Sequence, residues 1–146
     1  MDPLSITASV AGLVTFALTS ARSLNDLVSA YKGASNTLQS LSTDVQAVQG
    51  LLNSLSSHLV TKRDSDLSDE QKAALQDLRG PLQGTQVACE AVRGKIQSIM
   101  SHSSESRTSK RDRFDLMWSD KEVNLRRAEL SKYQLTLSAA IGLVNL

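Results

Sequence analysis

The sequence predicts an all-α domain, a four- to five-helix bundle built from long antiparallel helices. Apolar residues recur at alternating spacings of three and four over two long stretches, and two segments have the form of a helix capping box. Aromatic residues make up only 3% of the 146 residues, so aliphatic side chains supply most of the apolar mass, which favours helices over strands. A chain of this length can bury one core, and we expect a single domain over residues 1–146.

Charge is unevenly distributed along the chain. The formal net charge is +1, which argues against a nucleic-acid partner, because neutralising several phosphates needs a concentrated basic surface. Cys89 is the only cysteine, so no intrachain disulfide can form and we expect a cytoplasmic protein. The charged residues before Lys62 are Asp2, Arg22, Asp26, Lys32 and Asp44.

The first predicted helix begins at Asp2 and Pro3, an N-cap followed by proline at the first helical position. No residue from Pro3 to Ala21 is charged, and this stretch would be about 28 Å long, close to the hydrocarbon thickness of a bilayer. Its apolar residues cover most of the circumference, so we expect burial on nearly all sides or contact with lipid. They are Leu4, Ile6, Val10, Leu13, Val14, Phe16 and Leu18.

A stripe of small and polar residues runs along the same helix. Such a stripe lets a neighbouring backbone approach closely in either environment. Because hydroxyl groups and glycine contribute little to membrane insertion, we expect a core helix that is marginal enough to be released and inserted. Lys32 and Gly33 predict its end. The stripe consists of Ser5, Ser9, Gly12, Thr15 and Thr19.

The second predicted helix has the clearest periodicity in the chain. Its apolar positions form a heptad seam, which calls for knobs-into-holes packing against partner helices. The polar run from Lys62 to Asp66 then predicts a solvated connection. The seam consists of Leu38, Leu41, Val45, Val48, Leu52, Leu55 and Leu59.

The third predicted helix begins at a capping box, in which Ser68 is followed three residues later by Gln71. Its seam keeps heptad spacing, although Gly80 and Pro81 fall inside it. Proline removes one helical hydrogen bond and clashes with the preceding turn, so we expect a kink near Pro81, at about Arg79. The seam consists of Leu75, Leu78, Leu82, Thr85, Cys89, Val92, Ile96 and Ile99.

Residues 101–113 contain no apolar side chain and predict a flexible basic loop. Trp118 is expected to close one end of the bundle, with a place at a membrane interface as the alternative. A second capping box, from Ser119 to Glu122, opens a last helix that is still apolar at Leu146, so we expect this domain to be the N-terminal part of a longer chain. The inner face of that helix consists of Val123, Leu130, Tyr133, Leu137, Ile141 and Val144.

No arrangement of residues in the sequence predicts catalysis, a metal site or a cofactor. His58 and His102 lie on different segments without ligands at metal spacing, and no glycine-rich phosphate loop or hydrolase motif is present. Cys89 lies on the heptad seam, which favours a small core residue over a nucleophile. We therefore expect a protein that acts by contact and is not an enzyme.

The opening Met1-Asp2-Pro3-Leu4-Ser5-Ile6, with Ala8-Ser9-Val10-Ala11-Gly12-Leu13 after it, resembles the start of the HeLo-like N-terminal domain of fungal STAND proteins, the counterparts of NOD-like receptors. The spacing around Cys89, the Met117-Trp118 pair and the segment from Leu135 to Val144 extend this resemblance over the whole chain. It implies an effector or signalling module ahead of a nucleotide-binding or repeat domain, in programmed cell death, heterokaryon incompatibility and innate immunity. It also implies a membrane-active segment at about residues 2–18.

Two functions follow as hypotheses. In the first, clustering of the parent protein brings the first helix to the plasma membrane, with membrane lipids as partners and a homo-oligomer as the active form. Insertion would use the seven apolar residues from Leu4 to Leu18. In the second, the heptad seams mediate homo-oligomerisation or adaptor docking, and the first helix stays in the core. The residues expected to attract anionic lipid are Arg107, Lys110, Arg111 and Arg113.

Overall fold

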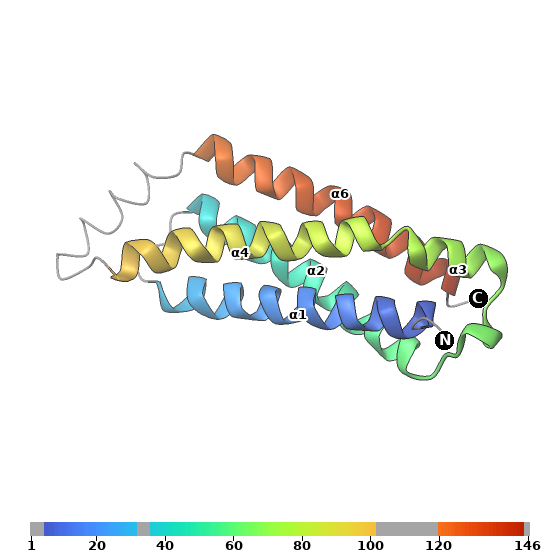
Figure 1. The fold of residues 1–146 in the computed structure, drawn as a ribbon. Helices are drawn as coiled ribbons and strands as arrows, with labels where there is room; N and C mark the ends of the chain where they lie inside the picture. Colours follow the sequence, from blue (N-terminus) through green and yellow to red (C-terminus); the bar gives the residue numbers. More distant parts are fainter. Residues whose placement is uncertain (1–4, 32–35, 102–119, 145–146) are drawn as a thin grey trace.

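The structure is a computed structural model that describes residues 5–31, 36–101 and 120–144, and it confirms the prediction of an all-α bundle (Figure 1). Four long helices dominate the described residues, and no strand is present among them. The elements are α1 (Ile6–Ala30), α2 (Asn36–Val60), the 3-10 helix η1 (Asp64–Asp66), α3 (Asp69–Gln76), α4 (Arg79–Ser101) and α6 (Asp120–Val144).

The four long helices surround one core in the cyclic order α1, α2, α6, α4, and each neighbouring pair in this order is in contact. Helices α1 and α4 run in one direction while α2 and α6 run in the other (Figure 1). The short helix α3 packs against α1 and α6 at one end of the bundle. There the Gln71 side chain donates a hydrogen bond to the Leu143 carbonyl at 3.0 Å. Helix α1 is therefore held by α2, α4 and α3 together.

The start of α1 differs from the prediction. Ser5 is the N-cap: its ψ angle of 155° is not helical, and its hydroxyl accepts a hydrogen bond from the Ala8 N–H at 3.0 Å. The prediction of a helix start at Asp2 and Pro3 is therefore wrong by about one turn. Residues 1–4, which include Leu4, lie outside the described residues.

Helix α1 buries one face only, so the expectation of burial on nearly all sides is also wrong. The buried face is continuous and includes polar side chains, whereas the opposite side of the helix faces solvent. This is the two-sided pattern of a surface helix in a globular protein. The buried residues are Thr7, Val10, Val14, Ala17, Ser20, Ala21, Leu24, Asn25 and Val28.

The heptad seam of α2 is confirmed, since all seven predicted positions from Leu38 to Leu59 are buried. The interface between α1 and α2 also contains a polar network. The Asn25 side chain donates to the Gln49 side chain at 2.8 Å and accepts from the Ser42 hydroxyl at 2.9 Å. Ser42 and Gln49 lie two turns apart on α2, so this network sets how far α1 and α2 are shifted along each other.

The predicted kink lies at Asp77 and Leu78, between α3 and α4. The carbonyl of Asp77 is the group to which an N–H at position 81 would donate, and Pro81 has no N–H. Pro81 instead lies in the first turn of α4, where a missing N–H breaks no helical bond. The seam stays in phase across the kink, as predicted, because all its residues from Leu75 to Ile96 are buried. The side chain of Ile99 is not among those described.

The inner face of α6 is confirmed. Val123, Leu130, Leu137 and Val144 are buried, and Tyr133 and Ile141 pack against the core. The predicted loop beyond Ser101, the Trp118 plug and the Ser119 cap lie outside the described residues.

Candidate interaction surface on the first helix

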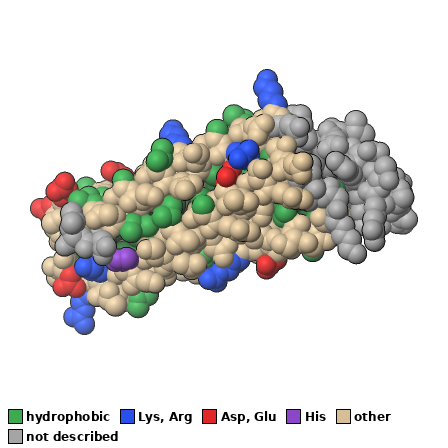
Figure 2. Space-filling view, turned by 180° about the vertical axis from the view of Figure 1, so that it is seen from behind, with side chains coloured by type: hydrophobic (Ala, Val, Ile, Leu, Met, Phe, Trp, Pro, Cys, Tyr) green, Lys and Arg blue, Asp and Glu red, His purple; other side chains and the backbone are tan. Residues whose placement is uncertain are grey.

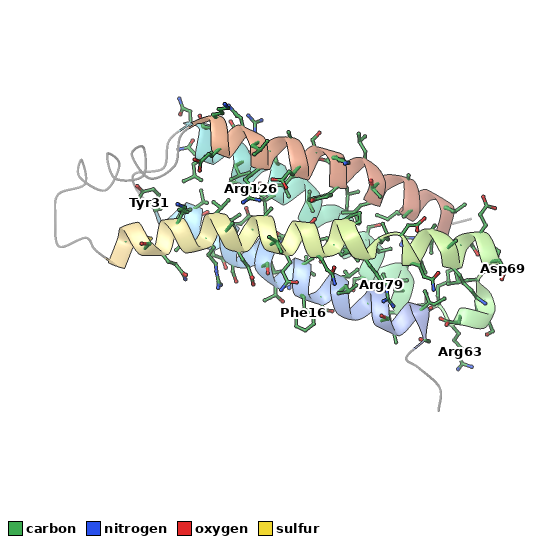
Figure 3. The ribbon with its side chains drawn as sticks, turned by 45° about the horizontal axis from the view of Figure 1, so that its top comes forward. Phe16, Tyr31, Arg63, Asp69, Arg79 and Arg126 are labelled. Atoms are coloured by element: carbon green, nitrogen blue, oxygen red, sulfur yellow. The ribbon has the colours of Figure 1, made fainter. Side chains whose placement is uncertain are left out.

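The structure places the described residues predicted for membrane insertion in three environments. Val10 and Val14 are fully buried in the core. Ile6, Leu13 and Leu18 are partly buried and pack against its edge. Phe16, by contrast, is 60% exposed and projects outward from α1 (Figure 3). The predicted set is therefore not one surface, and among its described members Phe16 is the one whose side chain lies mainly in solvent.

The small and polar stripe of α1 faces solvent around Phe16. Gly12, Thr15 and Thr19 are exposed, and the two threonine hydroxyls donate to carbonyls one turn earlier on the same helix, at 3.0 and 2.9 Å. A Cβ at Gly12 would meet no atom within 4 Å. The surface thus combines a large aromatic side chain with a glycine one turn away that has open space beside it.

This surface lacks charge. No residue of α1 from Ile6 to Ala21 is ionisable, and Arg22 bends toward Asn53 on α2, to which it donates at 3.3 Å. The single acidic residue of α2, Asp44, is paired with Arg127 of α6 at 2.7 Å. Figure 2 shows the back of the molecule, where charged side chains are few and scattered among uncharged ones. Depletion of charged residues is typical of the core of a protein–protein interface.

The N-terminal end of α1 is held by Asp64 of η1. Its carboxylate accepts hydrogen bonds from the backbone N–H groups of Ile6 and Thr7 at 2.9 and 3.0 Å, and from the Thr7 hydroxyl at 2.6 Å. The Thr7 hydroxyl bond is the main reason that the pKa of Asp64 is lowered below its ordinary value, with the two backbone bonds and Lys72 adding to the effect and partial desolvation opposing it. At neutral pH the cap therefore carries a negative charge at the positive end of the helix dipole.

Sequence reasoning missed this contact, because the run from Lys62 to Asp66 predicted only a solvated connection. The available signal was an aspartate in a short connection beside a helix start. Which helix it would cap depends on the antiparallel pairing of α1 and α2. Nearby, Arg79 of α4 donates to the Ser9 hydroxyl at 3.0 Å, so a second polar contact holds the same turn (Figure 3).

Among the described residues, the side chains that could take part in chemistry are not arranged as a reactive site. Cys89 is buried, and burial, together with the neighbouring Glu90, raises the pKa of its thiol to about 12. His58 on α2 contacts the carbonyl of Ser54 one turn earlier. Among residues 5–31, 36–101 and 120–144, no group of three histidine, cysteine or acidic side chains could hold a metal ion.

The membrane hypothesis depends on an apolar helix and on basic residues that attract anionic lipid. None of the described helices combines the length and the apolar character needed to cross a membrane. Arg107, Lys110, Arg111 and Arg113, the residues predicted to attract anionic lipid, lie outside the described residues.

The described residues define a class, a small all-α bundle in which four long helices surround one core. A family model described as pigment biosynthesis cluster protein PigL N-terminal matches residues 1–146, so the chain belongs to the family of PigL N-terminal domains. This agrees with the fungal N-terminal domain that the sequence resemblance implied, although the family is not specifically that of HeLo-like domains. No curated protein and no solved structure matches the chain.

Proposed function

We propose that this domain is a non-catalytic interaction module at the N-terminus of a larger fungal protein, and that it brings copies of that protein together. The contact surface is the outward side of α1, formed by Gly12, Thr15, Phe16 and Thr19. The observation that carries the proposal is the 60% exposure of Phe16 in the middle of an uncharged helix face. Exposed aromatic side chains in charge-poor surroundings are typical centres of protein interfaces.

A second copy of the same domain is the partner that fits this surface. The surface carries both a protruding ring at Phe16 and an open position at Gly12, one turn away. In a two-fold pair, each ring lies over the open position of the other copy, so one helix supplies both halves of the contact. Two identical uncharged faces also meet without like-charge repulsion.

Helix α1 acts in this proposal without leaving the bundle. Its buried face includes Val10, Val14, Leu24 and Val28, each at most 6% exposed. Transfer of such side chains from a core to water costs about 1.5–3 kcal/mol each. The outward residues need no rearrangement to reach a partner.

The experiment is sedimentation equilibrium of the domain over a wide concentration range. We expect wild type to self-associate and Phe16→Ser to weaken the dissociation constant by about tenfold or more, as for a central interface residue. Leu135→Ser is the matched control, because Leu135 is 72% exposed but lies on α6. A monomeric wild type at all concentrations, or equal weakening by both substitutions, contradicts the proposal.

Membrane insertion of α1 is the second candidate, supported by the charge-free stretch from Ile6 to Ala21 and by the exposed Phe16. Its test is dye release from anionic vesicles by artificially clustered copies of the domain. Deleting residues 1–20 is a poor control, because the deletion removes the core residues Val10 and Val14. Phe16→Asp is the better variant. If clustered wild type releases no dye, or Phe16→Asp releases as much, membrane insertion is excluded.

A further inference from the structure

The first turn of α1 depends on groups outside the helix. The N–H groups at the start of any α-helix lack partners within it. Here Ser5 accepts from Ala8, while Asp64, 57 and 58 residues away, accepts from Thr7 and Ile6. Two of the three capped N–H groups therefore depend on a side chain from the connection between α2 and α3.

Apolar packing contributes little to holding this turn. Ile6 is only partly buried, Ala8 is exposed, and the first apolar side chain fully inside the core is Val10. Thr7 is 5% exposed, and its hydroxyl donates to Asp64 at 2.6 Å. Polar contacts therefore hold residues 6–9, whereas burial holds the helix from Val10 onward.

The segment that supplies Asp64 has hydrogen bonds of its own, apart from the contact with α1. Within η1 the Asp66 carboxylate accepts from the Arg63 N–H at 3.0 Å, and the Asp66 N–H donates to the Arg63 carbonyl at 2.9 Å. The helix α3 that follows has its own capping box, in which Ser68 and Gln71 cap each other's N–H groups at 2.8 and 3.1 Å. We therefore expect both neighbouring elements to stay intact when the Asp64 contact is lost.

We propose that Asp64 is a latch, a conformational device that holds or frees the first turn of α1 while the bundle stays folded. In the closed state its carboxylate caps Ile6 and Thr7. In the open state residues 6–9 leave the bundle, which also breaks the hydrogen bond from Arg79 to Ser9 and uncovers part of α3, against which α1 packs, while Val10 and the residues after it remain in the core. The latch concerns only the conformation of α1, so it holds or fails independently of self-association.

The experiment is amide hydrogen exchange of the whole 146-residue chain, read residue by residue by NMR. We compare wild type with Asp64→Asn, which keeps the shape of the side chain but removes one acceptor and the charge. Exchange at residues 6–9 should become about fivefold faster or more, the effect of losing a helix cap, with exchange from Val14 to Val28 unchanged. Asp66→Asn is the matched control, because Asp66 caps only Arg63.

Three results would overturn the latch. Exchange at residues 6–9 that is the same in wild type and Asp64→Asn shows that the contact does not hold the turn. An equal acceleration throughout α1 and α2 shows that the contact serves global stability and not a local opening. If Asp66→Asn accelerates amide exchange at residues 6–9 as much as Asp64→Asn does, the loss of any negative charge from η1 is enough to free the turn.

Discussion

The ring of Tyr133 on α6 occupies the space that a side chain at Gly84 of α4 would need. A Cβ built at Gly84 would overlap the Tyr133 hydroxyl and the ring carbon that bears it, and would lie 3.0 Å from the ring Cε2. The absence of a side chain at position 84 is therefore what lets α6 approach α4 here. This close approach positions the inner face of α6 against the core.

Gly84→Ala is therefore expected to destabilise the domain, although alanine is the better helix former. Overpacking of this kind costs about 1–3 kcal/mol. Gly94→Ala, on the same helix, should instead stabilise by up to about 1 kcal/mol, because a Cβ there meets no atom within 4 Å. Urea unfolding measures both. In a Tyr133→Ala background the penalty at Gly84 should disappear, and an undiminished penalty would show that the ring is not its cause.

The Asn25 network should stabilise the pairing of α1 with α2. Asn25→Ala leaves the Ser42 hydroxyl and the Gln49 amide without their shared partner in a buried interface. We expect a loss of about 1–3 kcal/mol in the free energy of unfolding. Gln46→Ala is the control, since Gln46 is exposed on α2 and should change stability by about 0.5 kcal/mol or less. Equal effects of the two substitutions would contradict a specific role for the network.

Because of Asp64, the free energy of unfolding should change with pH in the acid range. Hydrogen bonds, first that of the Thr7 hydroxyl, lower its folded-state pKa below the ordinary 3.8. The unfolded chain therefore binds the proton more readily, so the contribution is complete above about pH 4–5 and disappears as the pH falls through the lowered folded-state value. The difference in urea midpoint between wild type and Asp64→Asn should be constant near neutrality and vanish at low pH. A difference that persists at low pH would mean that the carboxylate charge is not responsible.

The sequence predicted most of the fold because heptad spacing reports burial directly. Every position of the α2 seam is buried, and the kink follows from one residue, Pro81, whose missing N–H acts locally. The start of α1 was predicted less well, since Asp2 and Ser5 are both good N-caps and only contacts with distant residues distinguish them. Asp64 favours a start at Ile6, because its carboxylate accepts hydrogen bonds from the N–H groups of Ile6 and Thr7.

The candidate surface could be predicted only in part. The charge-free stretch of α1 was evident, but composition could not distinguish the buried Val10 and Val14 from the exposed Phe16. Which arc of a helix faces a core depends on how many neighbours surround it. Here the contacts with α2, α4 and α3 leave one arc free.

Self-association through α1 is tested most directly by cross-linking copies of the domain at chosen positions. Thr19→Cys places a thiol one turn from Phe16, whereas Ser138→Cys places one on the exposed side of α6. Native Cys89 should not react, because it is buried and its thiol pKa is raised to about 12. With a short bis-maleimide, covalent dimers are expected from Thr19→Cys and not from Ser138→Cys. Equal yields from both variants, or none from Thr19→Cys, would contradict self-association through this surface.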